Sequence, residues 1–270
     1  MKNIFEWGEK RTKRNFTVSD LLKLKGKIKL TQVNIANGDE ANAAVEANID
    51  MLIGFPNKIN EIRTVAPYQF YTAVFQHKAY HNKDDLLRAS MFALENGADA
   101  IYTPKNPHVV EYLARESVPV MAHLGFIPVK STWTGGIRGT GKTANEAYKL
   151  YQQFKDMENA GAFAVESEII AENVLTEISK RTNMSIISLG SGNGGDVNYL
   201  FMCDICGEKK DAPRHAIRYG NLFDLNQKVQ KERIKALKKF NLDAKKNNFA
   251  KKNKIVSISK NELEDFLDLL

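Results

Sequence analysis

The sequence is poor in cysteine and has no long apolar run. Its two cysteines, Cys203 and Cys206, are too few for a disulfide framework in a chain of 270 residues, which favours a reducing compartment. No apolar segment approaches the ~20 residues that a membrane-spanning helix requires. Residues 1–7 also lack the apolar stretch of a secretory signal peptide. We therefore expect a cytoplasmic globular protein without a membrane partner.

Net positive charge is confined to one segment. The chain has a net charge of +7, but residues 226–254 carry 11 Lys and Arg against two acidic residues, which leaves −2 for the rest. The body of the protein therefore has no electrostatic footprint for nucleic acid. Apolar residues at 225, 229, 234, 237 and 240 fall near helical spacing. This pattern favours a helix with one docked face and one solvated lysine face over a phosphate-binding tail.

Short apolar runs alternate with helical patterns along most of the chain. Eight predicted strands cover residues 27–34, 50–54, 70–75, 98–102, 119–124, 162–165, 186–190 and 199–203. Helical patterns lie at residues 17–25, 38–48, 83–96, 108–115 and 143–160. This alternation predicts an α/β protein with a (β/α)₈ TIM barrel. The predicted organisation is an N-terminal helical segment at 1–26, a barrel at 27–225 and a basic helical extension at 226–270.

Two polar residues stand at the ends of predicted strands. Glu168 follows the sixth strand, where a carboxylate can act as a general acid or base in the mouth of a barrel, although a solvated loop carboxylate beside Glu166 and Glu172 is the alternative. His123 ends the fifth strand inside an apolar run, and a hydrogen-bonded core histidine is its simpler interpretation.

Glycine-rich segments suggest two phosphate-binding alternatives. Residues 136–143 match the P-loop pattern, but residues 130–134 separate this loop from its strand, which counts against a nucleotide hydrolase. Gly190 and Gly192 follow the seventh strand, where barrels often bind phosphate or carboxylate groups through backbone N–H. A tight turn between two strands explains these glycines equally well.

Two groups of potential metal ligands have simpler explanations. Cys203 and Cys206 form a single CxxC without a second pair, so a structural zinc site is not expected. A second group follows the third strand and consists of His77, His81, Asp84 and Asp85. A polar loop that enters a helix accounts for this group.

Short phrases spread over residues 17–225 resemble one known family. They are TVSDLLK at 17–23, KLT at 29–31, GADA at 97–100, VMAHLG at 120–125, GG at 135–136, GKT at 141–143, AGAFA at 160–164, Glu168, GSG at 190–192 and Asp204. In this order they resemble ketopantoate hydroxymethyltransferase (3-methyl-2-oxobutanoate hydroxymethyltransferase), in the phosphoenolpyruvate mutase/isocitrate lyase superfamily. The family loop itself satisfies the P-loop pattern, which removes the nucleotide hydrolase alternative.

The resemblance implies a (β/α)₈ fold, a homo-oligomer such as a decamer, and an aldol-type reaction of pantothenate biosynthesis. In the family a divalent metal stabilises the enolate of a 2-oxo acid, which attacks the one-carbon unit of methylenetetrahydrofolate. By resemblance, Glu168 falls on the catalytic glutamate and His123 on a histidine that contacts substrate.

The sequence departs from the family where the metal ligands belong. Phe55 stands where the family has an aspartate, the third strand ends near Val74 without the second aspartate, and residues 102–105 replace the family's lysine and glutamate. We therefore do not expect the usual Mg²⁺ site. Lys105 or Arg138 is predicted to hold the substrate carboxylate, with Gly190 and Gly192 as further substrate contacts.

The predicted function is a divergent hydroxymethyltransferase that acts on a small 2-oxo acid. Two alternatives stay open, namely another carbon–carbon bond lyase or aldolase acting on a 2-oxo acid, and a non-catalytic paralogue. Retention of His123 and Glu168 favours an active site, and loss of the carboxylates favours the alternatives.

Overall fold

The computed structural model describes residues 1–76, 80–211, 213, 216–248 and 255–270. The chain forms two compact units. The first consists of Met1–Ile205 with Asp211–Arg218, and the second of Cys206–Lys210 with Tyr219–Leu270. Within these described ranges no helix is both long enough and apolar enough to cross a membrane.

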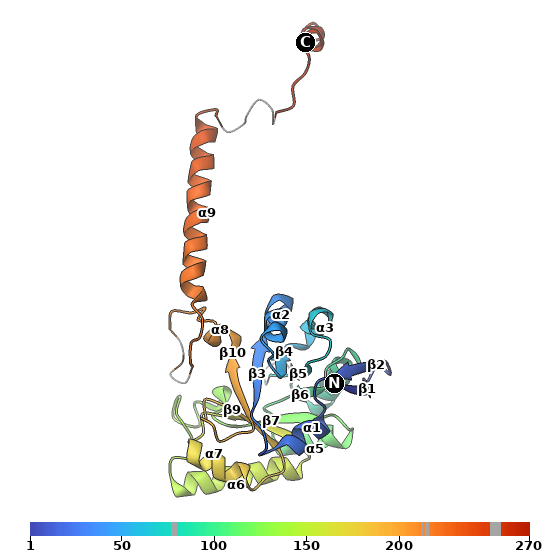
Figure 1. Cartoon of the computed structure of the whole chain (residues 1–270), viewed down its shortest axis with the longest axis vertical. Helices are drawn as coiled ribbons and strands as arrows, with labels where there is room; N and C mark the ends of the chain where they lie inside the picture. Colours follow the sequence, from blue (N-terminus) through green and yellow to red (C-terminus); the bar gives the residue numbers. More distant parts are fainter. Residues whose placement is uncertain (77–79, 212, 214–215, 249–254) are drawn as a thin grey trace. The chain divides into compact units, whose positions relative to one another are not determined.

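The first unit is built around a closed barrel of eight parallel strands, in the order β10-β3-β4-β5-β6-β7-β8-β9 (Figure 1). The strands are β3 (Leu30–Ile35), β4 (Met51–Gly54), β5 (Phe70–Val74), β6 (Ala100–Tyr102), β7 (Val120–Gly125), β8 (Ala164–Glu168), β9 (Ser185–Leu189) and β10 (Val197–Phe201). This arrangement confirms the predicted (β/α)₈ barrel. Because all strands run in parallel, their carboxyl ends open at one mouth.

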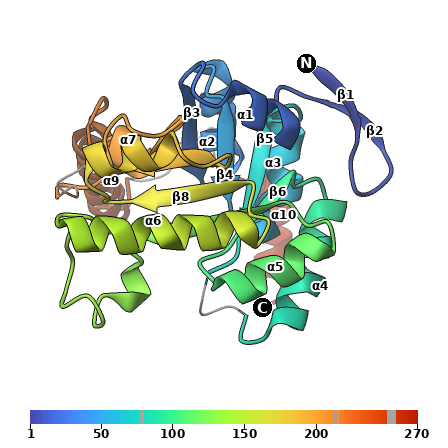
Figure 2. The same cartoon turned by 90° about the horizontal axis from the view of Figure 1, so that it is seen from below.

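Helices follow most of the strands, and Figure 2 shows α4, α5 and α6 on the outer side of the barrel. The helices of this unit are α1 (Val18–Leu24), α2 (Gly38–Glu46), α3 (Ile59–Val65), α4 (Lys83–Glu95), α5 (Pro107–Arg115), α6 (Ala144–Asn159), α7 (Glu172–Ser179) and α8 (Met202–Ile205). Two single-turn 3₁₀ helices, η1 (Pro56–Lys58) and η2 (Pro128–Lys130), follow β4 and β7. The eighth strand was predicted two residues too late, and its last predicted residues begin α8.

No helix separates β9 from β10, which agrees with the tight turn that was one of the two interpretations of Gly190 and Gly192. The connection, residues 190–196, runs close to the preceding elements. A Cβ on Gly195 would lie 2.7 Å from the Ile186 carbonyl oxygen, and one on Gly194 would lie 2.8 Å from the Thr176 backbone nitrogen. Glycine at these positions therefore lets the backbone pack directly against β9 and α7.

The N-terminal segment is only partly helical, so the predicted helical segment at 1–26 needs correction. Strands β1 (Lys2–Phe5) and β2 (Arg11–Arg14) form an antiparallel hairpin before α1. Helix α1 begins with a capping box, in which the side chains of Thr17 and Asp20 each accept a hydrogen bond from the other's backbone N–H. The hairpin escaped prediction because its residues are mostly charged and exposed and lack an apolar alternation.

A buried ion network ties the hairpin to the barrel. Arg14 is only 1% exposed, and its Nε donates to Asp99 Oδ1 at 2.7 Å. Arg63 donates to the other carboxylate oxygen of Asp99, also at 2.7 Å. The Asp99 carboxylate thus bridges two arginines that are both shielded from water, and Glu6 supplies a second carboxylate to Arg14 at 3.3 Å.

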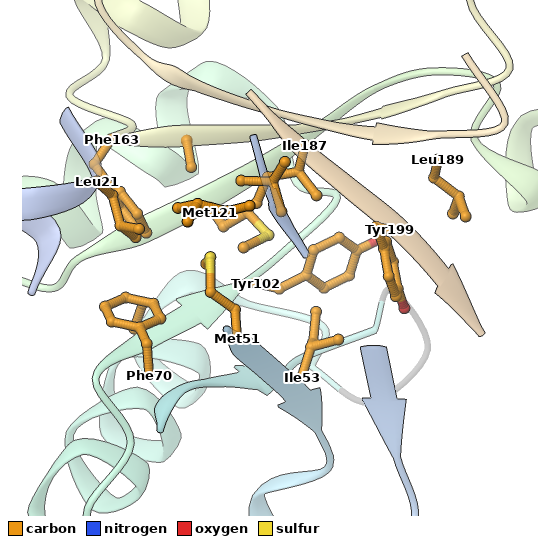
Figure 3. Close-up of a cluster of buried hydrophobic side chains, with 14 residues drawn as sticks. Leu21, Met51, Ile53, Phe70, Tyr102, Met121, Phe163, Ile187, Leu189 and Tyr199 are labelled. Carbon is orange, nitrogen blue, oxygen red and sulfur yellow. The ribbon is translucent and has the colours of Figure 1, made fainter. Parts of the chain in front are cut away.

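The core of the barrel is a cluster of inward-facing side chains (Figure 3). Phe70 and Phe163 make an edge-to-face contact in it, with centroids 6.2 Å apart. The cluster also contains two tyrosines, Tyr102 and Tyr199, and Figure 3 shows both beside Ile53. Residue alternation along the strands therefore carries polar groups into an interior that is otherwise apolar.

The second unit contains helices α9 (Leu222–Lys245) and α10 (Lys260–Leu267). Helix α9 confirms that the basic segment is helical. Its predicted docked face is uncovered in the single chain, since Leu225, Val229, Ile234, Leu237 and Phe240 are 43–66% exposed. No residue of α9 is buried.

Candidate functional site

Three titratable side chains converge at the carboxyl ends of β7 and β8. His123 lies opposite Glu166 in the strand register, and Gly125 lies opposite Glu168. Because side chains alternate along a strand, Glu166 and Glu168 both share the inward face of Ala164. Parallel pairing therefore brings one imidazole and two carboxylates into the mouth of the barrel.

The imidazole of His123 is the centre of this group. Its Nε2 lies 3.0 Å from Glu168 Oε2 and 3.8 Å from Glu166 Oε1. Its Nδ1 is 2.7 Å from the hydroxyl of Tyr102, which comes from β6. Neither carboxylate contact of Nε2 has the direction of a hydrogen bond. His123 thus has one ring nitrogen fixed by Tyr102 and the other close to two carboxylates.

The group borders a cavity of about 390 Å³. The described residues that line it are Gln76, Tyr102, Pro104, His123, Ile127, Pro128, Val129, Glu166, Glu168 and Phe201. The side chains of His123 and Glu166 are 2% and 7% exposed, whereas that of Glu168 is 13% exposed. A cavity of this size accommodates a small organic acid.

Gly125 allows β7 and β8 to close together beside Glu168. It has φ +91°, and a Cβ there would lie 2.3 Å from the Glu168 carbonyl oxygen. The Phe126 N–H donates to that same carbonyl at 2.8 Å. A side chain at position 125 would displace the backbone that holds Glu168.

Burial and like charge perturb the acidic groups of the site. Burial raises the pKa of Glu166 to about 7, with His123 opposing this shift and Glu168 adding to it. Burial also raises the pKa values of Tyr102 and Tyr199 well above 10, and the two glutamates raise them further. Both phenols are therefore protonated at neutral pH, and Glu166 exchanges a proton near neutrality. A carboxyl group that titrates near pH 7 in a cavity is a feature of acid–base sites.

The other residues predicted to bind substrate do not line this cavity. Lys105 Nζ donates to the Tyr80 carbonyl at 2.7 Å, and Arg138 pairs with Glu146 at 2.7 Å. Gly192 packs so tightly against Glu172 that a Cβ would lie 2.5 Å from its carboxyl carbon. Gly190 has φ +64° directly after β9. The structure thus brings together His123 and Glu168 but places these four residues elsewhere.

The P-loop-like segment caps a helix. Thr143 accepts a hydrogen bond from the Glu146 N–H and is the N-cap of α6. Strand β7 ends at Gly125, well before this loop, as the position of residues 130–134 suggested.

The polar group after the third strand has local partners. Asp84 accepts a hydrogen bond from the Tyr112 hydroxyl, and Asn82 caps α4 by accepting from the Asp85 N–H. These contacts agree with the interpretation as a helix entry. His77 lies outside the described residues.

The positions expected for the family's metal ligands carry no carboxylate. Phe55 is 48% exposed and Val74 packs against the core. Across the described residues, one group of three side chains has the spacing of a metal site, namely His123, Glu166 and Glu168. Imidazole nitrogen and carboxylate oxygen are both good ligands for divalent cations. The chemistry of this donor set therefore fits such an ion on β7 and β8.

Glu166 and Tyr102 were missed by the sequence-based prediction of site residues. The predicted sixth strand stopped at Val165, whereas β8 extends to Glu168. With that extension, alternation places Glu166 on the same face as Glu168. Tyr102 had no comparable signal, because its partner His123 is 21 residues away in the chain.

Comparison with known proteins supports the resemblance. The sequence model described as ketopantoate hydroxymethyltransferase matches residues 61–252. A 3-methyl-2-oxobutanoate hydroxymethyltransferase of Kosmotoga olearia is 28% identical, over 86% of this chain and 94% of its own length. The enzyme of the same name from Thermotoga maritima is also 28% identical, over 88% of this chain and 97% of its own length.

Solved structures show a similar fold at low sequence identity. A 2,3-dimethylmalate lyase of the PEP mutase/isocitrate lyase superfamily has a TM-score of 0.52 and 11% identity, with 84% of this chain and 88% of that chain covered. Oxaloacetate acetylhydrolase in complex with oxalate has a TM-score of 0.53 and 8% identity, with coverage of 75% and 82%. The family match covers more than half of the chain, and the barrel agrees with it. The chain belongs to the ketopantoate hydroxymethyltransferase family.

Proposed function

We propose that the chain catalyses aldol-type transfer of a one-carbon unit to a small 2-oxo acid in the β7–β8 cavity. The observation that carries this proposal is the pairing of His123 Nε2 with Glu168 Oε2 at 3.0 Å, in a family whose curated relatives are named hydroxymethyltransferases. The expected reaction converts 2-oxoisovalerate, methylenetetrahydrofolate and water into ketopantoate and tetrahydrofolate.

In this reaction Glu168 is the proton-transfer group. It removes the proton from the carbon next to the keto group, and the electron pair of that C–H bond forms the new bond to the one-carbon unit. Glu168 suits this role because its side chain is the more exposed of the two glutamates. His123 lies beside it, with Nε2 3.0 Å from Glu168 Oε2, and Tyr102 fixes the orientation of the imidazole through the contact at Nδ1.

One observation favours the second candidate, a different carbon–carbon bond reaction on a 2-oxo acid. The positions after β4 and β5 that carry metal ligands in the family are Phe55 and Val74, and Phe55 is 48% exposed. The bound acid would therefore contact different groups than it does in relatives that retain those carboxylates. The buried carboxyl group of Glu166 argues against the non-catalytic alternative, because a buried carboxylate without a function destabilises the fold.

The test is an assay of purified protein with 2-oxoisovalerate and methylenetetrahydrofolate, with and without added divalent cation. We expect turnover in wild type and a decrease in kcat of about 10²–10⁴-fold for Glu168→Gln, which is the usual range for loss of a general acid–base group. The matched control is Glu111→Gln on α5, an exposed glutamate paired with Arg115. Unchanged kcat in Glu168→Gln would remove Glu168 from the mechanism. Absence of turnover in folded wild type would favour the second candidate.

Further predictions about the substrate site are tested in the same assay. The contributions of Lys105 and Arg138 to carboxylate binding remain predictions, and KM for the oxo acid in Lys105→Ala and Arg138→Ala measures them. The family resemblance also predicts a homo-oligomer, which light scattering of the purified protein measures.

A further inference from the structure

The atoms of His123, Glu166 and Glu168 have the spacing of a cation-binding site. One ligand atom from each residue lies within 4.8 Å of the others, and the two contacts of Nε2 are 3.0 and 3.8 Å. Two ligand atoms that each lie about 2.1 Å from one ion are at most about 4.2 Å apart. The ligand atoms of these three side chains therefore need to move by less than about 1 Å to bind the same ion. No backbone rearrangement is required to bring these donors to one ion.

The second observation is the state of the histidine. His123 is 2% exposed, and its buried Nε2 has no hydrogen-bond partner in the described part of the chain. Its Nδ1 contacts the Tyr102 hydroxyl at 2.7 Å. When Nδ1–H donates to that oxygen, Nε2 carries a lone pair and lies 3.0 and 3.8 Å from the two carboxylates without a hydrogen bond to either. Metal-binding histidines are commonly fixed in this way by a hydrogen bond at the other ring nitrogen.

The third observation is the charge of the cavity. Among its described lining residues there are two glutamates and a histidine, and neither lysine nor arginine. Lys105 and Arg138 have the other partners described above. An anionic 2-oxo acid would meet two carboxylates there, whereas a divalent cation balances their charge and attracts the anion.

We infer that His123, Glu166 and Glu168 bind one first-row divalent cation, with Mn²⁺ as the representative ion. The site would lie on β7 and β8 instead of at Phe55 after β4 and at the end of β5, where the family resemblance implies the metal ligands. The imidazole ligand favours ions such as Co²⁺ or Zn²⁺ over Mg²⁺, which is usually held by oxygen alone, and the two carboxylates also suit Mn²⁺.

The inference that these residues bind a cation does not depend on the proposed function. Only the identity of the anion that the cation would attract, a 2-oxo acid, rests on the proposed function. Glu168 can ligate through Oε2 and still exchange a proton through its second oxygen. The cation site and the proton-transfer role are therefore compatible in one side chain.

The test measures Mn²⁺ binding to the full-length chain after treatment with EDTA and removal of the chelator. Electron paramagnetic resonance detects free aqueous Mn²⁺, so its loss reports binding without any substrate. We expect one tight Mn²⁺ per chain, at least tenfold weaker binding in Glu166→Gln and Glu168→Gln, and no displacement by equimolar Mg²⁺. Tyr102→Phe should weaken binding about 10–100-fold, as losses of outer hydrogen-bond partners do.

Glu111→Gln is the control and should bind as wild type does. Circular dichroism establishes that each variant is folded. If Glu166→Gln unfolds, the Mn²⁺ affinities of the single variants Tyr102→Phe and Glu168→Gln test the inference. Absence of a tight Mn²⁺ in wild type, or equal binding in the variants and the control, would overturn the inference. Bound Mn²⁺ without hydroxymethyl transfer would reject the proposed reaction and support the cation site. Turnover without Mn²⁺ binding would support the proposed reaction and reject the cation site.

Discussion

Replacement of Glu166 by glutamine should stabilise the cation-free protein at alkaline pH and much less in acid. Burial raises the pKa of this carboxyl group from 4.5 to about 7. Between these values the folded state holds a proton that the unfolded state has lost, so the carboxyl group reduces stability as pH rises from ~4.5 through ~7. Glutamine carries no charge at any of these pH values and removes this dependence.

The magnitude follows from the size of the pKa shift. Each unit corresponds to about 1.36 kcal/mol, so ionisation of Glu166 costs on the order of 3 kcal/mol at pH 8 and less than about 1 kcal/mol at pH 5. Any fixed packing cost of the glutamine amide is the same at both pH values. The informative quantity is therefore the change in stability difference between pH 5 and pH 8, about 2–3 kcal/mol in favour of Glu166→Gln.

Urea unfolding at both pH values, in the presence of EDTA, measures this quantity. EDTA is required because a bound cation would favour the charged carboxylate. The exposed control Glu111→Gln should show the same difference from wild type at both pH values, within about 0.5 kcal/mol. A Glu166→Gln effect that does not change with pH would mean that Glu166 ionises normally and that the burial argument is wrong.

Two further predictions concern buried polar groups away from the carboxylates. Asp99→Asn leaves Arg14 and Arg63 without their shared carboxylate, so the free energy of unfolding in urea should fall by ~3–5 kcal/mol. An effect as small as that of Glu111→Gln would contradict the network. Gln32 on β3 is 1% exposed, and neither of its amide atoms has a partner in the described residues. Gln32→Met should therefore keep or raise the unfolding free energy, by up to about 1–2 kcal/mol. A marked destabilisation in the same urea assay would reveal an essential partner of the amide.

The basic C-terminal segment shows a limit of sequence patterns. Its apolar spacing correctly predicted a helix, because helical periodicity is a local property of the chain. The same pattern also suggested a docked face, yet Leu225 and Leu237 are 51% and 66% exposed in the single chain. An apolar stripe indicates that one face of a helix is suited to burial. The stripe does not identify the surface that covers that face.

The connection between β9 and β10 shows a second limit. Local patterns correctly placed a strand on either side, and they left open whether the glycines between them form a binding loop or a tight turn. Gly194 and Gly195 let the chain return along β9 without a helix. This conformation depends on close approach to the Ile186 carbonyl and the Thr176 backbone nitrogen, which are remote from the local sequence pattern.

The sequence alone determined the barrel and the position of two polar residues on it. Alternating apolar runs reflect the repeated strand and helix periods, and the spacing of polar residues placed His123 and Glu168 at strand ends. Only the tertiary structure decided that Glu166 and Tyr102 join them. Glu166 depends on the true end of β8, and Tyr102 on the neighbouring positions of β6 and β7 in the closed sheet. The perturbed pKa of Glu166 is likewise a tertiary property, since it arises from burial and from charges that only the closed barrel brings together.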